Sequence, residues 1–97
     1  MNKIRMIEIV KRSKSLDLYT VSFTLVQPQG MLEQRLRFQE KDLTFSRAKA
    51  FVKSKYFRQG WSMGNLTVRR QSDTKWKYFK SPNEFFTLPK EEDLVLQ

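Results

Sequence analysis

The residues best suited to chemistry lie in a basic and aromatic run near the C-terminal end. Residues 75–80 read Lys-Trp-Lys-Tyr-Phe-Lys, so that rings alternate with ammonium groups. Such rings stack on nucleic-acid bases, and ammonium groups contact phosphates. On a strand, Trp76 and Tyr78 share one face, and a place in the core is favoured over base stacking for these two rings. Lys75 and Lys77 are expected to stay exposed in either case.

Arginines and a glycine-flanked loop are two further candidate sites for phosphate. Arg69 and Arg70 are adjacent, and Arg35 and Arg37 are two residues apart. A guanidinium can bind a guanine edge or a phosphate through two hydrogen bonds. Residues 58–65 read Arg-Gln-Gly-Trp-Ser-Met-Gly-Asn, and glycine lets a backbone approach a phosphate closely. This spacing matches no phosphate loop, so a helix end followed by a tryptophan at the core edge is the favoured interpretation.

Positive charge is concentrated in the middle of the chain. The sequence has 19 basic and 10 acidic residues, a net charge of +9, and residues 43–80 hold ten basic residues against one acidic residue. A solubility surface mixes both signs, so this asymmetry favours a polyanionic partner. The predicted nucleic-acid-binding residues are Arg35, Arg37, Arg47, Lys49, Lys53, Lys55, Arg58, Trp61, Arg69, Arg70, Lys75, Lys77 and Lys80, with Trp76 and Tyr78 as candidates for base stacking.

The composition excludes several classes of chemistry. The chain has no cysteine and no histidine, which removes disulfides, thiolate catalysis, the commonest general base and the commonest metal ligand. Glu40 and Asp42 are interpreted as partners of a helix start, and residues 91–93 as a solvated acidic tail. We therefore expect a protein that is not an enzyme and that uses no cofactor and no metal ion.

The sequence contains no segment that predicts a membrane location. No run of 18 or more residues is apolar, and the first residues alternate charged and apolar types without the apolar region of a signal peptide. Together with the absence of cysteine, these features favour a cytoplasmic or nucleoid-associated protein. We expect no membrane partner.

Strands are predicted in the first half of the chain. Residues 3–12 are rich in β-branched and apolar types and predict a strand. Residues 16–26 and 31–39 alternate apolar and polar side chains, and the Gln-Pro-Gln-Gly sequence between them indicates a turn. Residues 16–39 are therefore predicted to form a β-hairpin.

The outward face of this hairpin is a candidate phosphate surface. If the apolar rows point to the core, Thr20, Ser22 and Thr24 lie beside Arg35 and Arg37 on the opposite face. Hydroxyl and guanidinium groups suit phosphate contact. An ordinary solvated sheet face explains the same pattern equally well.

One main helix is predicted over residues 43–58. Asp42 or Thr44 can cap its start, and an apolar stripe at helical spacing gives it a buried side. Gly60 is expected to end it. The remaining predicted elements are a hairpin of strands 65–71 and 74–80 and a short helix from Ser81-Pro82 to Pro89.

These elements predict a single small α+β domain over residues 1–89, followed by an acidic and apolar tail at residues 90–97. Their order, β-β-β-α-β-β-α, indicates a mainly antiparallel sheet of four or five strands, with the main helix packed on one face. In outline, three antiparallel strands followed by a helix resemble the integrase arm-binding and WGR types of small DNA-binding module. The chain has no Trp-Gly-Arg triplet.

Two functions from different classes fit the sequence. The first is non-enzymatic nucleic-acid binding, with DNA slightly preferred over RNA, in which helix 43–58 and strands 65–80 form one basic surface. With about five to eight phosphate contacts, log affinity would fall with log salt at a slope of about −4 to −7 on duplex DNA. The second is a protein-interaction module, an inhibitor or assembly factor, that docks on an acidic partner protein. Residues 85–86 and 94–96 would then be its contact elements or the seam of a homodimer.

Overall fold

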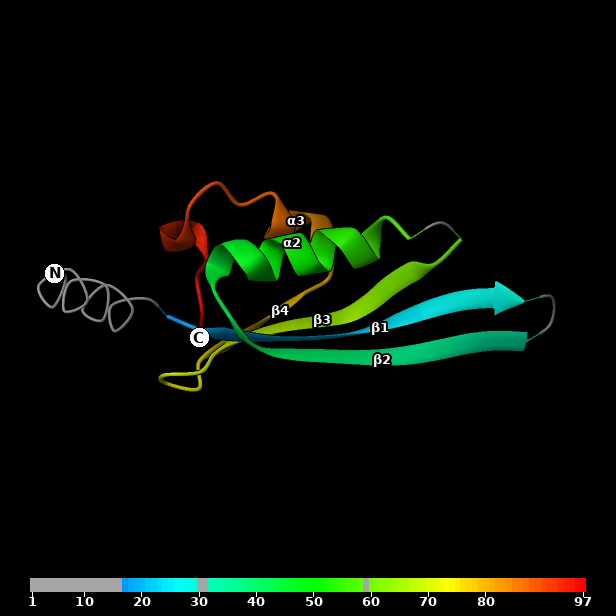
Figure 1. The fold of residues 1–97 in the computed structure, drawn as a ribbon, viewed down its shortest axis with the longest axis horizontal. Coiled ribbons are helices and arrows are strands. Elements are labelled where there is room, and N and C mark those ends of the chain that lie inside the picture. The colour runs from blue at the N-terminus through cyan, green and yellow to red at the C-terminus, as the bar shows by residue number, and fades with distance from the viewer. Residues whose placement is uncertain (1–16, 30–31, 59) are drawn as a thin grey trace, which may run out of the picture.

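The structure of the chain, a computed structural model, describes residues 17–29, 32–58 and 60–97. These residues form a four-stranded antiparallel sheet with helices, which confirms the predicted α+β class (Figure 1). The strand predicted over residues 3–12 lies outside the described residues, so the observed order begins with the hairpin. The elements are β1 (Tyr19–Gln29), β2 (Leu32–Leu43), α2 (Phe45–Tyr56), β3 (Ser62–Arg70), β4 (Trp76–Phe79), α3 (Pro82–Phe86) and the 3-10 helix η1 (Glu91–Asp93).

Within the described residues, helices cover the sheet on one face only. The strand order is β2-β1-β3-β4, and each neighbouring pair is antiparallel. Helix α2 lies across one face, and α3 packs beside it on the same side (Figure 1). Strands β1 and β3 are therefore central, and β2 and β4 form the edges. No helix in the described ranges is long and apolar enough to cross a membrane.

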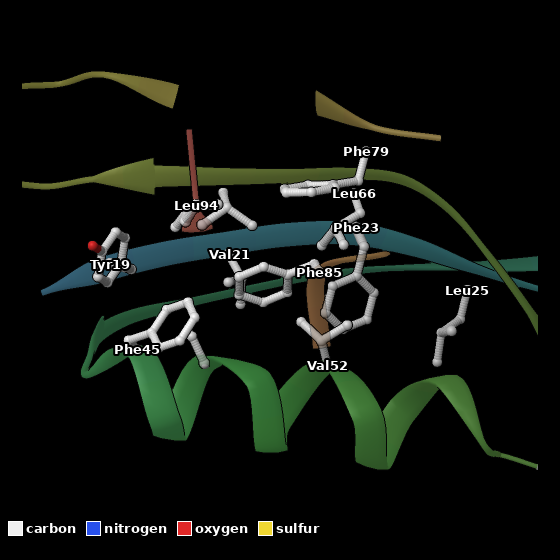
Figure 2. Close-up of a cluster of buried hydrophobic side chains, with 12 residues drawn as sticks. Tyr19, Val21, Phe23, Leu25, Phe45, Val52, Leu66, Phe79, Phe85 and Leu94 are labelled. Atoms are coloured by element: carbon white, nitrogen blue, oxygen red, sulfur yellow. The ribbon is translucent and has the colours of Figure 1, made fainter. Parts of the chain in front are cut away.

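The core lies between α2 and the covered face of the sheet. Alternate residues of β1 from Tyr19 to Leu25 point toward the helix and are at most 1% exposed (Figure 2). From α2, the apolar residues Phe45, Ala48 and Val52, which recur at helical spacing, are buried against them. The period-two pattern of β1 and the helical stripe of α2 thus define the two layers, as predicted.

The first hairpin is longer than predicted, because part of the predicted turn belongs to a strand. Strand β1 continues through Pro28 to Gln29, and β2 begins at Leu32, so residues 27–29 belong to a strand. Proline is tolerated because β1 pairs with β3 only as far as Val26, which makes the end of β1 an edge position. The end of the hairpin extends beyond the helix-covered part of the sheet (Figure 1).

Strand β2 also runs past its predicted end, through a β-bulge. Its register against β1 shifts by one residue near Tyr19. Asp42 lies at this shift with a φ of 59°, a conformation that Asp and Asn adopt more readily than most residues. The Thr44 side chain accepts a hydrogen bond from the backbone N–H of Arg47 at 3.3 Å. Of the two predicted caps, Thr44 is therefore the one that serves α2.

The second hairpin has a longer connection than predicted. The connection spans residues 71–75 instead of two residues. The Asp73 carboxylate accepts hydrogen bonds from the Lys75 backbone N–H at 3.1 Å and from Arg70 Nη1 at 2.8 Å. These two bonds stabilise a five-residue turn. Strand β3 contains a further bulge, where Asn65 has a φ of 56°.

The C-terminal segment is packed on the domain. Helix α3 starts at Pro82, as predicted, and its Phe85 is completely buried. Leu94 is 5% exposed, and Gln97 forms two backbone hydrogen bonds with Trp76, of 3.0 and 3.2 Å. Phe85 and Leu94 are therefore core residues. The prediction that they form contact elements is wrong for both.

Candidate nucleic-acid interface

The sheet face opposite α2, which we call the open face, collects polar, basic and aromatic side chains. The register places Arg69 of β3 between Thr20 of β1 and Trp76 of β4. Because these residues alternate with the buried ones, their side chains point away from α2. The open face consists of Arg35, Arg37, Gln39 and Lys41 from β2, Thr20, Ser22 and Thr24 from β1, Thr67 and Arg69 from β3, and Trp76 and Tyr78 from β4.

Three adjoining hollows lie on the open face. The first, of about 300 Å³, is lined by Arg37, Arg69 and three hydroxyl side chains. The second, of about 250 Å³, extends toward Lys41 and Gln71. The third, of about 550 Å³, lies beside Trp76. Because Arg69 lines all three hollows, its guanidinium can contact a group bound in any of them.

Gln71 links β1 and β2 by hydrogen bonds at one end of the open face. Its side-chain oxygen accepts hydrogen bonds from the Thr20 hydroxyl at 3.0 Å and from the Asp42 backbone N–H at 2.7 Å. Its side-chain nitrogen donates to Asp42 Oδ1 at 3.0 Å. These bonds hold the bulge of β2 against β1 and so fix the rim of the second hollow.

Trp76 and Tyr78 project from the open face and are not core residues. They are 51% and 46% exposed, so the favoured interpretation of these rings as core was wrong. The register directs Lys77 and Phe79 to the covered face, where Phe79 packs on Phe85 with 5.4 Å between ring centroids. The Lys77 ammonium lies 5.0 Å from the Phe79 ring centroid. Lys77 is half-buried, so the prediction that it stays exposed was wrong.

Four cations of the described residues lie on the open face, and three of them were predicted as binding residues. Arg37, Lys41 and Arg69 are exposed, and Arg35 lies two residues before Arg37 on the same side of β2. Among the described residues that line the three hollows there is no carboxylate. Positive potential in the hollows is therefore not neutralised by their own lining.

Two lysines of α2 are engaged on the covered side of the sheet. Lys49 Nζ donates a hydrogen bond to the Leu88 carbonyl at 2.6 Å and lies 4.6 Å from the Phe45 ring centroid. Lys55 Nζ lies 5.3 Å from the Phe38 ring centroid. Such contacts stabilise a cation on an aromatic face. Both lysines therefore have a structural role on the helix side.

Arg58 and Trp61 form a pair at the end of α2. The guanidinium lies 4.6 Å from the indole ring centroid, and Trp61 packs on the edge of the core, as the favoured interpretation of this loop predicts. Lys80 borders a hollow with Trp61, away from the open face. Also outside the open face are Arg47 and Lys53, which are exposed on α2, and Lys75, which is exposed in the β3–β4 turn.

Arg70 is held in ion pairs, although it follows Arg69 directly. Its Nη1 lies 2.8 Å from Asp73 Oδ2, and its Nε lies 3.6 Å from Asp17 Oδ2. Hydrogen bonds to Asp73 and then to Tyr19 raise the pKa of Arg70. Arg70 therefore organises the β3–β4 turn and does not belong to the open face.

The basic residues of segment 43–80 are thus divided between two sides of the sheet. Helix α2 covers one face of the sheet (Figure 1). The register directs Arg69 to the other face, so helix 43–58 and strands 65–80 do not form one basic surface. Within the described residues, no three potential metal ligands of the His, Cys, Asp or Glu types gather.

Comparisons of the chain with known proteins identify no similar protein. No protein-family model matches the chain, and no curated protein or solved structure matches it. The candidate site is therefore assigned from geometry and chemistry.

Sequence reasoning missed four residues of this site. Gln39 and Lys41 follow the alternation of Arg37 along β2, and Thr67 follows that of Arg69 along β3. All three could be found once the strands are known. Gln71 has no such signal, because its partners lie 29 and 51 residues away in the sequence.

Proposed function

We propose that this protein binds nucleic acid without catalysing a reaction, and that the open face is its binding surface. The supporting observation is the exposure of Trp76 and Tyr78 on the same uncovered face as Arg37 and Arg69. Aromatic rings offer flat surfaces to bases, and guanidinium groups bind phosphates. A ligand that carries both bases and phosphates would use both kinds of group at once.

The first hollow supports the phosphate part of this proposal. Arg37 and Arg69 enter it from the two strands that flank β1, and the hydroxyls of Thr20, Ser22 and Thr67 complete its lining. Guanidinium and hydroxyl groups together make many of the phosphate contacts in protein–nucleic acid complexes. The described residues that line this hollow include no carboxylate or imidazole that could serve as a general base, which supports binding without catalysis.

Removing positive charges from one face at a time tests the location of the binding surface. The double substitution Arg37→Ala/Arg69→Ala should weaken binding to a dye-labelled oligonucleotide at least about tenfold in fluorescence anisotropy. It should also make the slope of log affinity against log salt shallower by about 1.4 to 1.8, because each lost phosphate contact removes about 0.7 to 0.9.

The matched control removes the same charge from the helix side. Arg47→Ala/Lys53→Ala deletes two exposed cations of α2, and affinity should stay within about threefold, because charges beyond about 8 Å are screened at physiological salt. An equal loss for both double variants would show that net charge alone matters, and the assignment to the open face would be wrong.

Docking on an acidic partner protein is the second candidate function. The exposure of Phe57 supports protein docking, because this apolar side chain is 66% exposed at the end of α2. Its ring centroid lies 5.3 Å from that of Tyr56 and 5.8 Å from that of Phe86. Exposed aromatic groups are common anchors of protein interfaces. Sedimentation of the parent and of Phe57→Ser at two concentrations tests the homodimer form of this alternative, since self-association through Phe57 should disappear in the variant.

A further inference from the structure

Among the described residues, no aromatic ring contacts the two exposed rings of β4. Each of the other rings of β4, α2 and α3 has an aromatic neighbour, as Phe79 has in Phe85 and Phe51 has in Phe23. Trp76 and Tyr78 take part in no ring–ring or cation–ring contact in the described ranges, and each leaves about half of its surface open. Each ring therefore has exposed surface on which a planar group of a ligand can stack.

We infer that the open face takes an unpaired nucleic-acid strand, with bases stacked on Trp76 and Tyr78. This inference rests on the proposed function and names its substrate class. The bases of a duplex already stack on each other and are paired inside the helix, whereas unpaired bases can turn outward onto aromatic side chains. A surface that offers rings beside guanidinium groups therefore favours the unpaired strand.

The spacing of the rings supports an extended strand. Residues two apart on a β-strand are about 7 Å apart, whereas successive phosphates of a duplex strand advance about 3.4 Å along the axis. Trp76 and Tyr78 are separated by one residue of β4. Consecutive bases can each use one ring only if the strand is stretched to about twice its duplex rise, which pairing prevents.

The hollows give such a strand a path. The third hollow lies beside Trp76 and is also lined by Thr67, Thr74 and Arg69, and its 550 Å³ falls in the range of about 300 to 1,000 Å³ typical of small-ligand sites. Arg69 also lines the first hollow, and Arg37 lines that hollow from β2. With bases stacked over β4 and phosphates bound over β3, β1 and β2, a strand would use both the exposed rings and the guanidinium groups of the open face.

A duplex bound by the β1–β2 hairpin is the competing mode. A two-stranded ribbon fits the major groove of B-form DNA, and Arg35 and Arg37 lie on this hairpin. That mode leaves Trp76 and Tyr78 without a role, because both rings lie on the opposite edge of the sheet. The choice between the modes is therefore decided at the two rings.

Fluorescence anisotropy with the full chain tests the inference. The probes are dye-labelled oligothymidylate, oligouridylate of the same length, and a blunt-ended duplex. Oligothymidylate should bind at least about tenfold more tightly than the duplex, and Trp76→Leu should reduce its affinity about 5- to 100-fold, the range for one lost base stack. Trp76→Phe keeps a ring and should retain most of the affinity. Oligouridylate should bind about as well as oligothymidylate, because neither stacking nor phosphate contact needs a 2′-hydroxyl.

A spectroscopic readout locates the contact. The chain has two tryptophans, so Trp61→Phe leaves Trp76 as the single fluorescent tryptophan. Oligothymidylate should quench this fluorescence, and the duplex should not. Trp76→Leu should keep its thermal midpoint within about 4 °C of the parent, as expected for an exposed side chain, so that a loss of binding is not a loss of fold.

The outcomes separate the inference from the proposed function. If duplex and oligothymidylate bind equally and Trp76→Leu has no effect, the unpaired-strand inference is overturned while binding through the open face stands. A tenfold preference for oligouridylate would overturn the stacking-and-phosphate account. If no probe binds in a manner that depends on Arg37 and Arg69, the proposed function fails, and the inference fails with it.

Discussion

At the residue scale, adjacent side chains of this sheet have different environments. Arg69 points to the open face, whereas Arg70 is paired with Asp73 and Asp17 at the β3–β4 turn. Tyr19 illustrates the covered side: it is 1% exposed, and its hydroxyl donates a hydrogen bond to Glu91 Oε2 at 2.6 Å. Burial, followed by this hydrogen bond, raises the pKa of Tyr19 to about 12.

Tyr19 should make stability depend on alkaline pH. Its folded-state pKa of about 12 lies above the ordinary value of 10.0, so the stabilisation is fully present below pH 10 and is lost as pH rises through 12. At neutral pH, Tyr19→Phe should lower the free energy of unfolding by about 1 kcal/mol, the usual net value of one hydrogen bond. Urea unfolding of parent and variant from pH 8 to pH 12 measures this difference. A difference that stays constant over that range would contradict the assignment.

At the element scale, two bulges set the geometry of the open face. The bulge at Asp42 lets β2 continue to Leu43, which places Lys41 beside the second hollow. The bulge at Asn65 lies in β3, two residues before Thr67. Both bulges use a residue type that accepts a positive φ with little strain. The local sequence therefore permits each bulge, and pairing with β1 fixes its position.

The Asn65 bulge gives a prediction for β3. Asn65 has a φ of 56°, a conformation that a β-branched residue adopts only with strain of about 1–3 kcal/mol. Asn65→Val should therefore lower the free energy of unfolding in urea by at least about 1 kcal/mol. Asn65→Gly is the control and should change it by no more than about 0.5 kcal/mol, because glycine takes this conformation freely. Equal losses in the two variants would show that side-chain contacts of Asn65, and not its backbone, are responsible.

At the scale of the whole molecule, the net charge of +9 does not act as one surface. The open face carries Arg35, Arg37, Lys41 and Arg69. Lys49, in contrast, is bonded to the α3–η1 connection on the covered side. Under the proposed function, one strand would contact about four phosphates on the open face, fewer than the full excess of positive charge would allow.

The salt dependence of binding should reflect this smaller number. With three to four phosphate contacts, the slope of log affinity against log salt for oligothymidylate should be about −2 to −3, because each contact on a single strand contributes about −0.7. Anisotropy titrations at several salt concentrations measure the slope. A slope steeper than about −4 would mean that cations of α2 also contact the ligand, and binding would not be confined to the open face.

The sequence by itself determined the α+β class, the buried row of β1 and the apolar stripe of α2, because alternation and helical period are local properties of the chain. It did not determine how far the hairpins extend, since the bulge at Asp42 depends on Gln71, 29 residues away. The environment of Trp76 was decided only by the tertiary structure. An alternating strand defines two faces, but which face is buried depends on its partners, and here Phe79 packs on Phe85 and turns Trp76 outward. The separation of Arg69 from the cations of α2 has the same origin, because a helix packed on one side of a sheet faces away from residues on the other.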